Sequence, residues 1–197
     1  MGKQVWVKII PWSMEIAQAA MESGVDALWV EPGVSPQVKK MGLIPTVAED
    51  GDYVLGRDVV EKEVVEKKDE EEIINLSFSK KVVVKGKDWT IIPLENLLSR
   101  AGNIFVEITD LQDGQTAFSI LEKGVDGVVL NQSDPQKVRQ IVRQLKAENE
   151  RFDLWPARVK SIEPLGLGDR VCVDTCSAMV PGEGMLVGNS SQALFLV

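Results

Sequence analysis

The sequence predicts an α/β fold, in which a parallel βα-repeat unit resembling part of a barrel is followed by a β-rich segment. Apolar, β-branched runs alternate with helix-like patterns through the first 152 residues, as expected for parallel strands joined by crossover helices. Glycine, proline and aspartate residues punctuate these runs. After Phe152 the pattern changes to strand, turn and strand. We therefore expect an α/β domain at residues 1–152 and a β-rich segment at 153–197, the start of a second domain.

The first elements follow from apolar periodicity and its breakers. Residues 5–10 are apolar and β-branched except for Lys8, and Pro11 ends this strand. Residues 14–23 place their apolar side chains on one helical face, and Gly24 is a suitable helix stop. The next expected elements are a strand at 26–31, a short helix at 35–41 and a strand at 43–47.

A second cycle of elements follows after residue 100. We expect strands at 104–108 and 127–130, and helices at 113–123 and 134–148, the last begun by Asp134 and Pro135. Within it, ESGVDALWV from Glu22 is echoed by EKGVDGVVL from Glu122. Each reads as a helix end, a glycine cap, an aspartate and a buried strand, which indicates a repeated structural solution.

The middle and the end of the chain are less regular. Residues 59–72 are dense in Glu, Lys and Asp but keep a partial stripe of valines, which predicts a solvated amphipathic helix. Near the end, residues 155–163 and 169–175 read as strands, and residues 193–197 begin another apolar strand.

Composition excludes several classes of function. A net charge of −8 argues against nucleic acid or an anionic membrane as the main partner. No run reaches the roughly 18 apolar residues of a membrane span, and there is no N-terminal signal pattern. The chain has no histidine, so Ser-His-Asp and Cys-His nucleophiles and histidine-containing zinc sites are excluded within it. The two cysteines indicate free thiols in a reducing cytoplasm.

Three candidate catalytic residues lie on predicted strands. Lys8 interrupts an apolar strand, which predicts a desolvated amine with a lowered pKa or, alternatively, a solvent-facing lysine near a strand end. Glu31 and Asn131 follow strands, where ligands of parallel α/β proteins bind. Glu107 has apolar neighbours, which favours an inward carboxylate that either takes part in catalysis or forms a structural ion pair with Lys8.

The segment RVCVDTCSAMVPGEGMLVGNSSQALFLV, from Arg170, carries the densest set of polar and small residues. Alternation places Cys172, Asp174 and Cys176 on one strand face. Asp174 can serve as a base or metal ligand, or as a hydrogen-bonded turn aspartate. The cysteines read as packing residues. A glycine-turned cradle for an anionic group is predicted at Gly182, Gly184, Gly188, Asn189, Ser190 and Ser191, with a plain β-turn as the alternative.

This segment resembles the signature of the type II 3-dehydroquinate synthases. Four further segments also resemble this family: VWVKIIPW from Val5, AEDGD from Ala48, EKGVDGV from Glu122 and IEPLGLGDR from Ile162. It covers essentially the whole chain. Val180 departs from it, because the family tends to have lysine there, and the chain stops where the family continues through His-Ser-Glu.

The resemblance implies an NAD-dependent oxidative deamination of an amino-deoxy-heptulosonate, followed by cyclisation to 3-dehydroquinate in aromatic amino-acid biosynthesis. NAD is then the cofactor, and Mn²⁺ or Mg²⁺ on carboxylates is compatible with the composition. Two alternatives stay open: a manganese-dependent aminohydroxybenzoate synthase, and a shortened homologue with a binding or structural role. We expect Lys8, Glu31, Glu107 and Asp174 to meet in one cleft. We also expect self-association, or a partner that supplies the missing C-terminal part.

Overall fold

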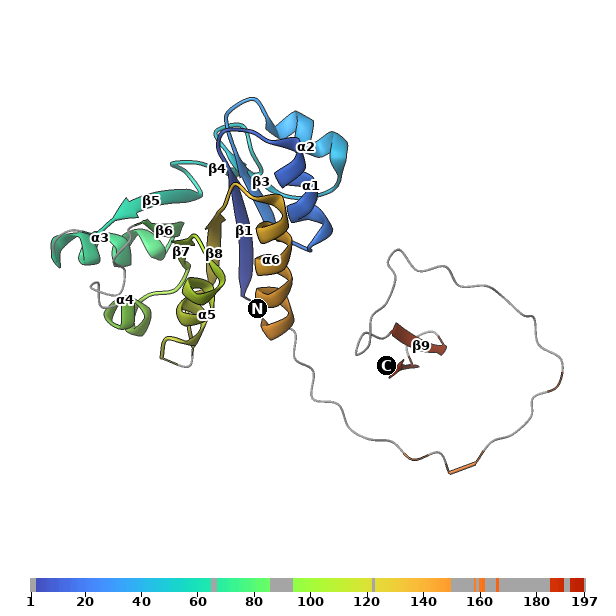
Figure 1. Cartoon of the computed structure of the whole chain (residues 1–197). Helices are drawn as coiled ribbons and strands as arrows, with labels where there is room; N and C mark the ends of the chain where they lie inside the picture. Colours follow the sequence, from blue (N-terminus) through green and yellow to red (C-terminus); the bar gives the residue numbers. More distant parts are fainter. Residues whose placement is uncertain are drawn as a thin grey trace. The chain divides into compact units, whose positions relative to one another are not determined.

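The computed structural model divides the chain into two compact units, Met1–Asp153 and Leu154–Val197 (Figure 1). It describes residues 3–64, 67–85, 94–121, 123–149, 185–189 and 192–196, together with the single positions 158, 160, 161 and 166.

Unit 1 is an α/β barrel-like sheet. Its described strands are β1 (Gln4–Ile9), β2 (Ala27–Val30), β3 (Thr46–Ala48), β4 (Tyr53–Val54), β5 (Val59–Glu63), β6 (Lys81–Lys85), β7 (Ile104–Ile108) and β8 (Gly127–Asn131). All pair in parallel, in the order β4-β3-β2-β1-β8-β7-β6-β5. A parallel bridge between Leu55 and Val59 links the two ends of this order. The strands thus follow one another around a nearly closed ring, as in a (βα) barrel.

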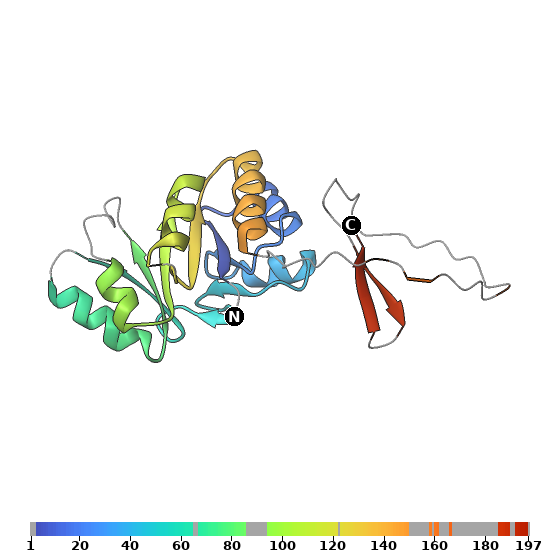
Figure 2. The same ribbon diagram turned by 90° about the horizontal axis from the view of Figure 1, so that it is seen from below.

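Six described helices cover the outside of this sheet. They are α1 (Met14–Glu22), α2 (Ser35–Met41), α3 (Lys67–Ser77), α4 (Leu94–Arg100), α5 (Leu111–Ser119) and α6 (Pro135–Asn149). The two views show these helices lying along the strands on the sheet's outer side (Figures 1 and 2). The α/β class and the parallel βα repeat expected from the sequence are therefore confirmed.

Strand alternation divides the buried side chains into two layers. On β1, Val5, Val7 and Ile9 belong to the large apolar cluster that packs under the helices. Trp6, between them, belongs to a smaller cluster on the other face, inside the barrel. The members of this interior cluster are Trp6, Ala27, Trp29, Val47, Val59, Val83, Phe105 and Val129. Trp6 lies against Phe105 and Tyr53, with ring centroids 4.4 and 5.5 Å apart.

The sequence echo is a recurring contact at the amino ends of the strands. The Asp26 carboxylate accepts the backbone N–H of Val5 at 2.7 Å, and the Asp26 N–H returns a bond to the Val5 carbonyl at 2.9 Å. Asp126 makes the same pair of bonds with Ile104, at 3.2 and 2.9 Å. Each aspartate precedes one strand and satisfies the free N–H of the strand beside it. The echoed residues therefore fasten neighbouring strands at the bottom of the barrel.

Two parts of unit 1 differ from the sequence expectation. The amphipathic helix expected at 59–72 is present only in its second part: residues 59–63 form β5, and the helix α3 starts at Lys67. The elements β4, β6 and α4 were not expected at all. Strands β5 and β6 carry charged side chains at positions that face the barrel interior. In the sequence, such charges interrupt the apolar pattern of a strand and look like the polar face of a solvated helix.

Unit 2 contains an antiparallel hairpin. Strand β9 (Met185–Asn189) pairs with β10 (Gln192–Leu196), with Gly188 opposite Ala193 and Asn189 opposite Gln192. The strand expected near the chain end is thus present, whereas those expected at 155–163 and 169–175 lie outside the described residues. Among the residues that are described, no helix combines the length and hydrophobicity needed to cross a bilayer.

Candidate active site

The interior of the barrel becomes charged toward the carboxyl ends of the strands. On β1, β5, β6, β7 and β8, alternation carries the interior face from an aromatic or valine residue to a polar one two positions later. The polar residues are Lys8, Glu61, Lys85, Glu107 and Asn131, and they form what we call the barrel-mouth network. Active sites of parallel α/β barrels lie at this end.

Lys8 is the centre of the barrel-mouth network. Its Nζ donates to Glu61 Oε1 at 2.6 Å and to Glu107 Oε2 at 3.1 Å. The same ammonium lies 4.8 Å from the ring centroid of Trp29, its neighbour on β2. Only 11% of the Lys8 side chain is exposed, so two carboxylates and an aromatic ring take the place of water around the charge.

Both carboxylates are held from their far sides as well. Glu61 Oε2 lies 2.7 Å from Lys85 Nζ. Glu107 Oε1 accepts a hydrogen bond from Asn131 Nδ2 at 3.0 Å. The order is therefore Lys85, Glu61, Lys8, Glu107, Asn131, with alternating charge and an exposed amide at one end. Each carboxylate has two donors, which fixes its orientation.

The network keeps Lys8 protonated. Burial lowers the pKa of Lys8, but the hydrogen bonds and charges of Glu61 and Glu107 outweigh it, so the pKa lies above its ordinary value. For Glu61, burial raises the pKa, and the hydrogen bonds from Lys8 and Lys85 outweigh that effect, so its pKa is lowered. The lowered pKa expected for Lys8 is thus wrong, because sequence reasoning counted its apolar strand neighbours and missed Glu61.

The alternative interpretation of these residues, an ion pair between Lys8 and Glu107, is confirmed. A fixed ammonium of raised pKa is poorly suited to nucleophilic attack, which requires the neutral amine. It is well suited to stabilising negative charge that develops on a carbonyl oxygen. Glu107 is 19% exposed and Glu61 30%, and one of the two donors to Glu107 is the exposed amide of Asn131.

Glu31 lies at the same end of the barrel but has a different contact. It follows β2, and its Oε2 accepts the backbone N–H of Trp12 at 3.1 Å. This bond ties the loop after β1 to the end of β2. No described hydrogen bond or ion pair joins Glu31 to Lys8. Of the expected constellation, Lys8 and Glu107 meet, and Asp174 lies outside the described residues. Glu31 follows β2, the neighbour of β1, and has no described contact with either.

The expected anion cradle lies in unit 2. Gly182, Gly184, Ser190 and Ser191 are outside the described residues. Gly188 and Asn189 stand in β9 and pair with β10, and the anion cradle stays a prediction. In the described part of the chain, no three His, Cys, Asp or Glu side chains are grouped so that they could hold a metal ion.

Sequence reasoning missed Glu61 and Lys85. Glu61 was assigned to a solvated helix and Lys85 to no element. A signal was available: VVEKE at Val59 and KVVVK at Lys81 each place a charged residue two positions beyond an interior valine. In a parallel barrel this is the pattern of a strand whose last interior residue reaches the mouth.

Comparison with known proteins assigns a family. The model of the 3-dehydroquinate synthase II N-terminal domain matches residues 2–145, and that of the C-terminal domain matches residues 156–197. Proteins named 3-dehydroquinate synthase from Methanoculleus marisnigri and Methanoregula boonei are each 43% identical over 195 residues. A 3-dehydroquinate synthase homolog from Aquifex aeolicus is 42% identical over 196 residues. The chain spans 59% of the length of each of these relatives, and the matches cover 99% of the chain.

A solved structure supports the barrel assignment. Phosphoribosyl anthranilate isomerase from Thermotoga maritima aligns with a TM-score of 0.56 at 13% identity, covering 74% of this chain and 99% of the isomerase. At this identity the likeness concerns the fold alone. The family, in contrast, rests on sequence matches that span both units: the chain belongs to the 3-dehydroquinate synthase II family.

Proposed function

We propose that this protein acts in the synthesis of 3-dehydroquinate, through oxidative deamination of 2-amino-3,7-dideoxy-D-threo-hept-6-ulosonate and ring closure of the resulting dicarbonyl compound. Family membership supports the product class. The barrel-mouth network supports the carbonyl chemistry, because it brings a permanent ammonium and two oriented carboxylates together where α/β barrels bind substrates. The fixed Lys8 ammonium is the observation that carries the proposal.

Lys8 acts as the electrostatic group. Ring closure removes a proton from the carbon next to one carbonyl group, and negative charge then develops on that carbonyl oxygen. An ammonium already oriented by Glu61 and Glu107 stabilises this oxygen without reorganising. The raised pKa keeps the ammonium charged through this step. The neutral amine is not required.

Glu107 acts as the proton acceptor. Lys8 holds one of its oxygens and Asn131 the other, so the carboxylate is oriented toward the exposed end of the network. It takes the proton from the carbon, the enolate carbon attacks the second carbonyl carbon, and the new alkoxide is protonated from solvent or from the protonated Glu107. These ring-closure steps need no external oxidant. NAD would accept the hydride in the preceding deamination, which we do not assign to the barrel-mouth residues.

The test separates ring closure from oxidation. Lys8→Met removes the charge and keeps the length of the side chain, and Lys8→Arg keeps the charge. With the amino-heptulosonate and NAD⁺, we expect 3-dehydroquinate formation by Lys8→Met to fall by about 10²–10³-fold in kcat. Lys8→Arg should recover part of the loss. NADH formation, followed separately by absorbance, should be affected less than ring closure.

The matched control is Lys62→Met on the same barrel. Lys62 lies on β5 next to Glu61 but pairs with Glu72 of α3 on the outer side. Its replacement should leave both signals unchanged. Near-normal 3-dehydroquinate formation by a folded Lys8→Met protein would overturn the proposed role of the barrel-mouth network.

A further inference from the structure

The amino ends of the strands contain a second interior lysine, Lys81. It starts β6, and its side chain shares the interior face of Val83. Its Nζ lies 5.2 Å from the ring centroid of Phe105, 5.7 Å from that of Tyr53 and 6.0 Å from that of Trp6. Three rings thus surround one ammonium at the end of the barrel opposite to the barrel-mouth network.

Lys81 differs from Lys8 in its ionic partners. Lys8 has two carboxylates within 3.1 Å. Among the residues that the structure describes, no carboxylate forms an ion pair with Lys81. A structural lysine inside a barrel is expected to have an acidic partner, because an unpaired charge loses hydration without compensation. Aromatic faces offset only part of that loss.

A cavity of about 240 Å³ lies beside Lys81. Its lining is basic and polar, and comes from the amino ends of β1, β6, β7 and β8 and the turn before β8: Lys3, Gln4, Lys81, Asn103, Phe105, Lys123, Val125 and Asp126. Three lysines therefore face one aspartate. The carboxylate of that aspartate already accepts the N–H of Ile104 and fastens the strands. The cavity is smaller than a typical pocket for a dinucleotide or a drug-sized ligand.

Two polar atoms of this region have no partner among the described residues. One is Oε1 of Gln4, which lines the cavity. The other is Nε1 of the fully buried Trp6, which does not line the cavity but whose ring centroid lies 6.0 Å from Lys81 Nζ. Buried donors and acceptors are normally satisfied, so such atoms indicate a missing partner. Burial also lowers the pKa of Lys3, and Asp126 offsets this only in part. An anion in the cavity would offset the burial of the Lys3 charge and could supply a partner for Gln4.

We propose that this cavity, which we call the lower basic cavity, binds a small tetrahedral oxyanion of the phosphate class. Lys81 and Lys123 supply charge-assisted hydrogen bonds. Lys3, whose Nζ donates to the Phe118 carbonyl, adds positive charge to the lining. A protonated oxygen of the anion can donate to Gln4. This site is independent of the reaction proposed for the barrel mouth. Its chemistry fits free inorganic phosphate and the phosphoryl group of a small metabolite equally well.

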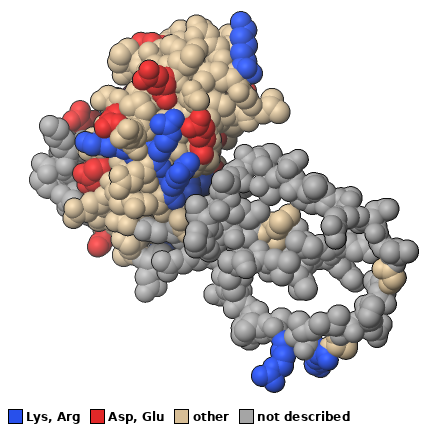
Figure 3. Space-filling view, turned by 45° about the vertical axis from the view of Figure 1, so that its right-hand side comes forward, with Lys and Arg blue, Asp and Glu red and all other residues tan. Residues whose placement is uncertain are grey.

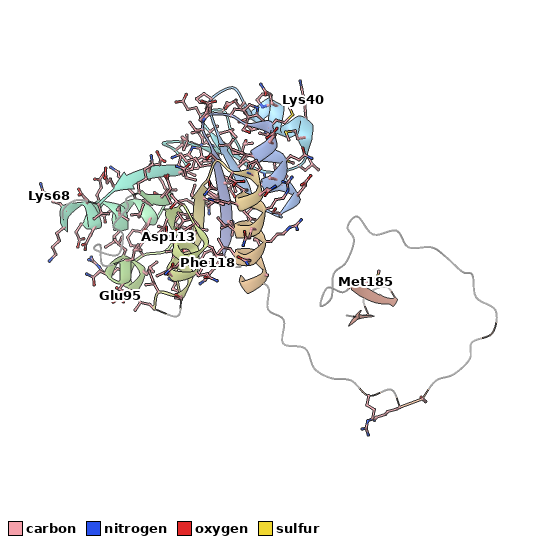
Figure 4. All side chains as sticks on the ribbon, viewed as in Figure 1. Lys40, Lys68, Glu95, Asp113, Phe118 and Met185 are labelled. Atoms are coloured by element: carbon pink, nitrogen blue, oxygen red, sulfur yellow. The ribbon has the colours of Figure 1, made fainter. Side chains whose placement is uncertain are left out.

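Titration calorimetry on the whole chain tests the site, with sodium phosphate as the probe at constant ionic strength. We expect saturable binding that Lys81→Met weakens at least about tenfold, the effect of losing one charge-assisted hydrogen bond. Lys123→Met, in an exposed turn where loss of fold is not expected, should weaken it less. Lys40→Met is the matched control, because Lys40 is exposed on α2, away from the cavity. Figure 4 shows Lys40 far from Phe118, whose ring and carbonyl contact the cavity residue Lys3.

A second measurement locates the anion. In nitrogen-15 NMR spectra, phosphate should shift the indole N–H signal of Trp6, identified by its loss in Trp6→Phe, more than those of the other tryptophans. Glycerol phosphate in place of phosphate distinguishes the sources: tighter binding indicates a phosphorylated metabolite, and binding of phosphate alone indicates the free ion. Absence of saturable binding, or equal weakening by Lys40→Met and Lys81→Met, would overturn the proposal.

Discussion

Replacing Lys8 by methionine should destabilise the protein through the carboxylates that it leaves behind. Lys8→Met keeps the side-chain length and the packing against Trp29, but removes the hydrogen bonds to Glu61 and Glu107. Glu61 still has Lys85, and Glu107 still has Asn131. The perturbation therefore leaves each carboxylate with one of its two donors.

The magnitude follows from those two lost bonds. A hydrogen bond to a charged group contributes about 1.5–3 kcal/mol, and breaking a buried pair costs about 3–5 kcal/mol. The exposed fractions of the Glu61 and Glu107 side chains are 30% and 19%, so water replaces part of the loss. We expect the free energy of unfolding to fall by about 2–3 kcal/mol. The double variant Lys8→Met with Glu107→Gln should recover part of this loss, because one stranded charge is removed.

The difference between wild type and variant should depend on pH in a defined direction. The raised pKa of Lys8 means that its stabilisation is complete below the unfolded lysine value of about 10.4 and disappears as pH rises through the folded pKa. The lowered pKa of Glu61 means that its contribution is present above about pH 4.3 and disappears as pH falls through the folded pKa. The difference should be largest between these limits.

Denaturant unfolding, followed by the fluorescence of the interior tryptophans, measures the effect across pH. Lys62→Met, which removes an outer-surface ion pair, provides the control and should change stability by less than about 1 kcal/mol. A Lys8→Met protein as stable as the wild type at neutral pH would show that the network contributes nothing to the fold. If the difference in the free energy of unfolding between wild type and Lys8→Met grew on acidification, the assigned lowering of the Glu61 pKa would be contradicted.

Two further predictions concern the scaffold. A Cβ added at Gly127 would overlap the Phe105 ring and lie 2.9 Å from the Gln4 carbonyl oxygen. Gly127→Ala should therefore lower the thermal midpoint of unfolding by the equivalent of about 1–3 kcal/mol. Gly102→Ala is the control and should leave the midpoint unchanged, because a Cβ at Gly102 meets open space. Asp110 accepts the Asp113 N–H at 2.9 Å as the N-cap of α5, so Asp110→Ala should cost about 1 kcal/mol in denaturant unfolding, and Asp110→Ser should recover most of it.

Local rules predicted the elements whose apolar residues face the helices. The helix Ser35–Met41 and the strand Ile104–Ile108 have the expected bounds, because periodicity, proline and glycine act within a few residues there. The failure at 59–72 has a different cause. Glu61 is charged because it meets Lys8 and Lys85 from two other strands, and such a partner is invisible in a local window. Sequence reasoning consequently found Lys8 and Glu107 but gave Lys8 the wrong charge state.

The two interior lysines differ in their ionic partners, and our two proposals rest on that difference. Both stand at interior positions, one near the end of an apolar strand and the other at the start of one, and both lie beside aromatic rings. The two lysines differ in the carboxylates that neighbouring strands place beside them. At the carboxyl ends, Glu61 and Glu107 bind and orient the Lys8 ammonium. At the amino ends, the nearby carboxylate of Asp126 fastens two strands. Asp126 forms no ion pair with Lys81 among the described residues, and our proposal therefore assigns the charge of Lys81 to a bound anion.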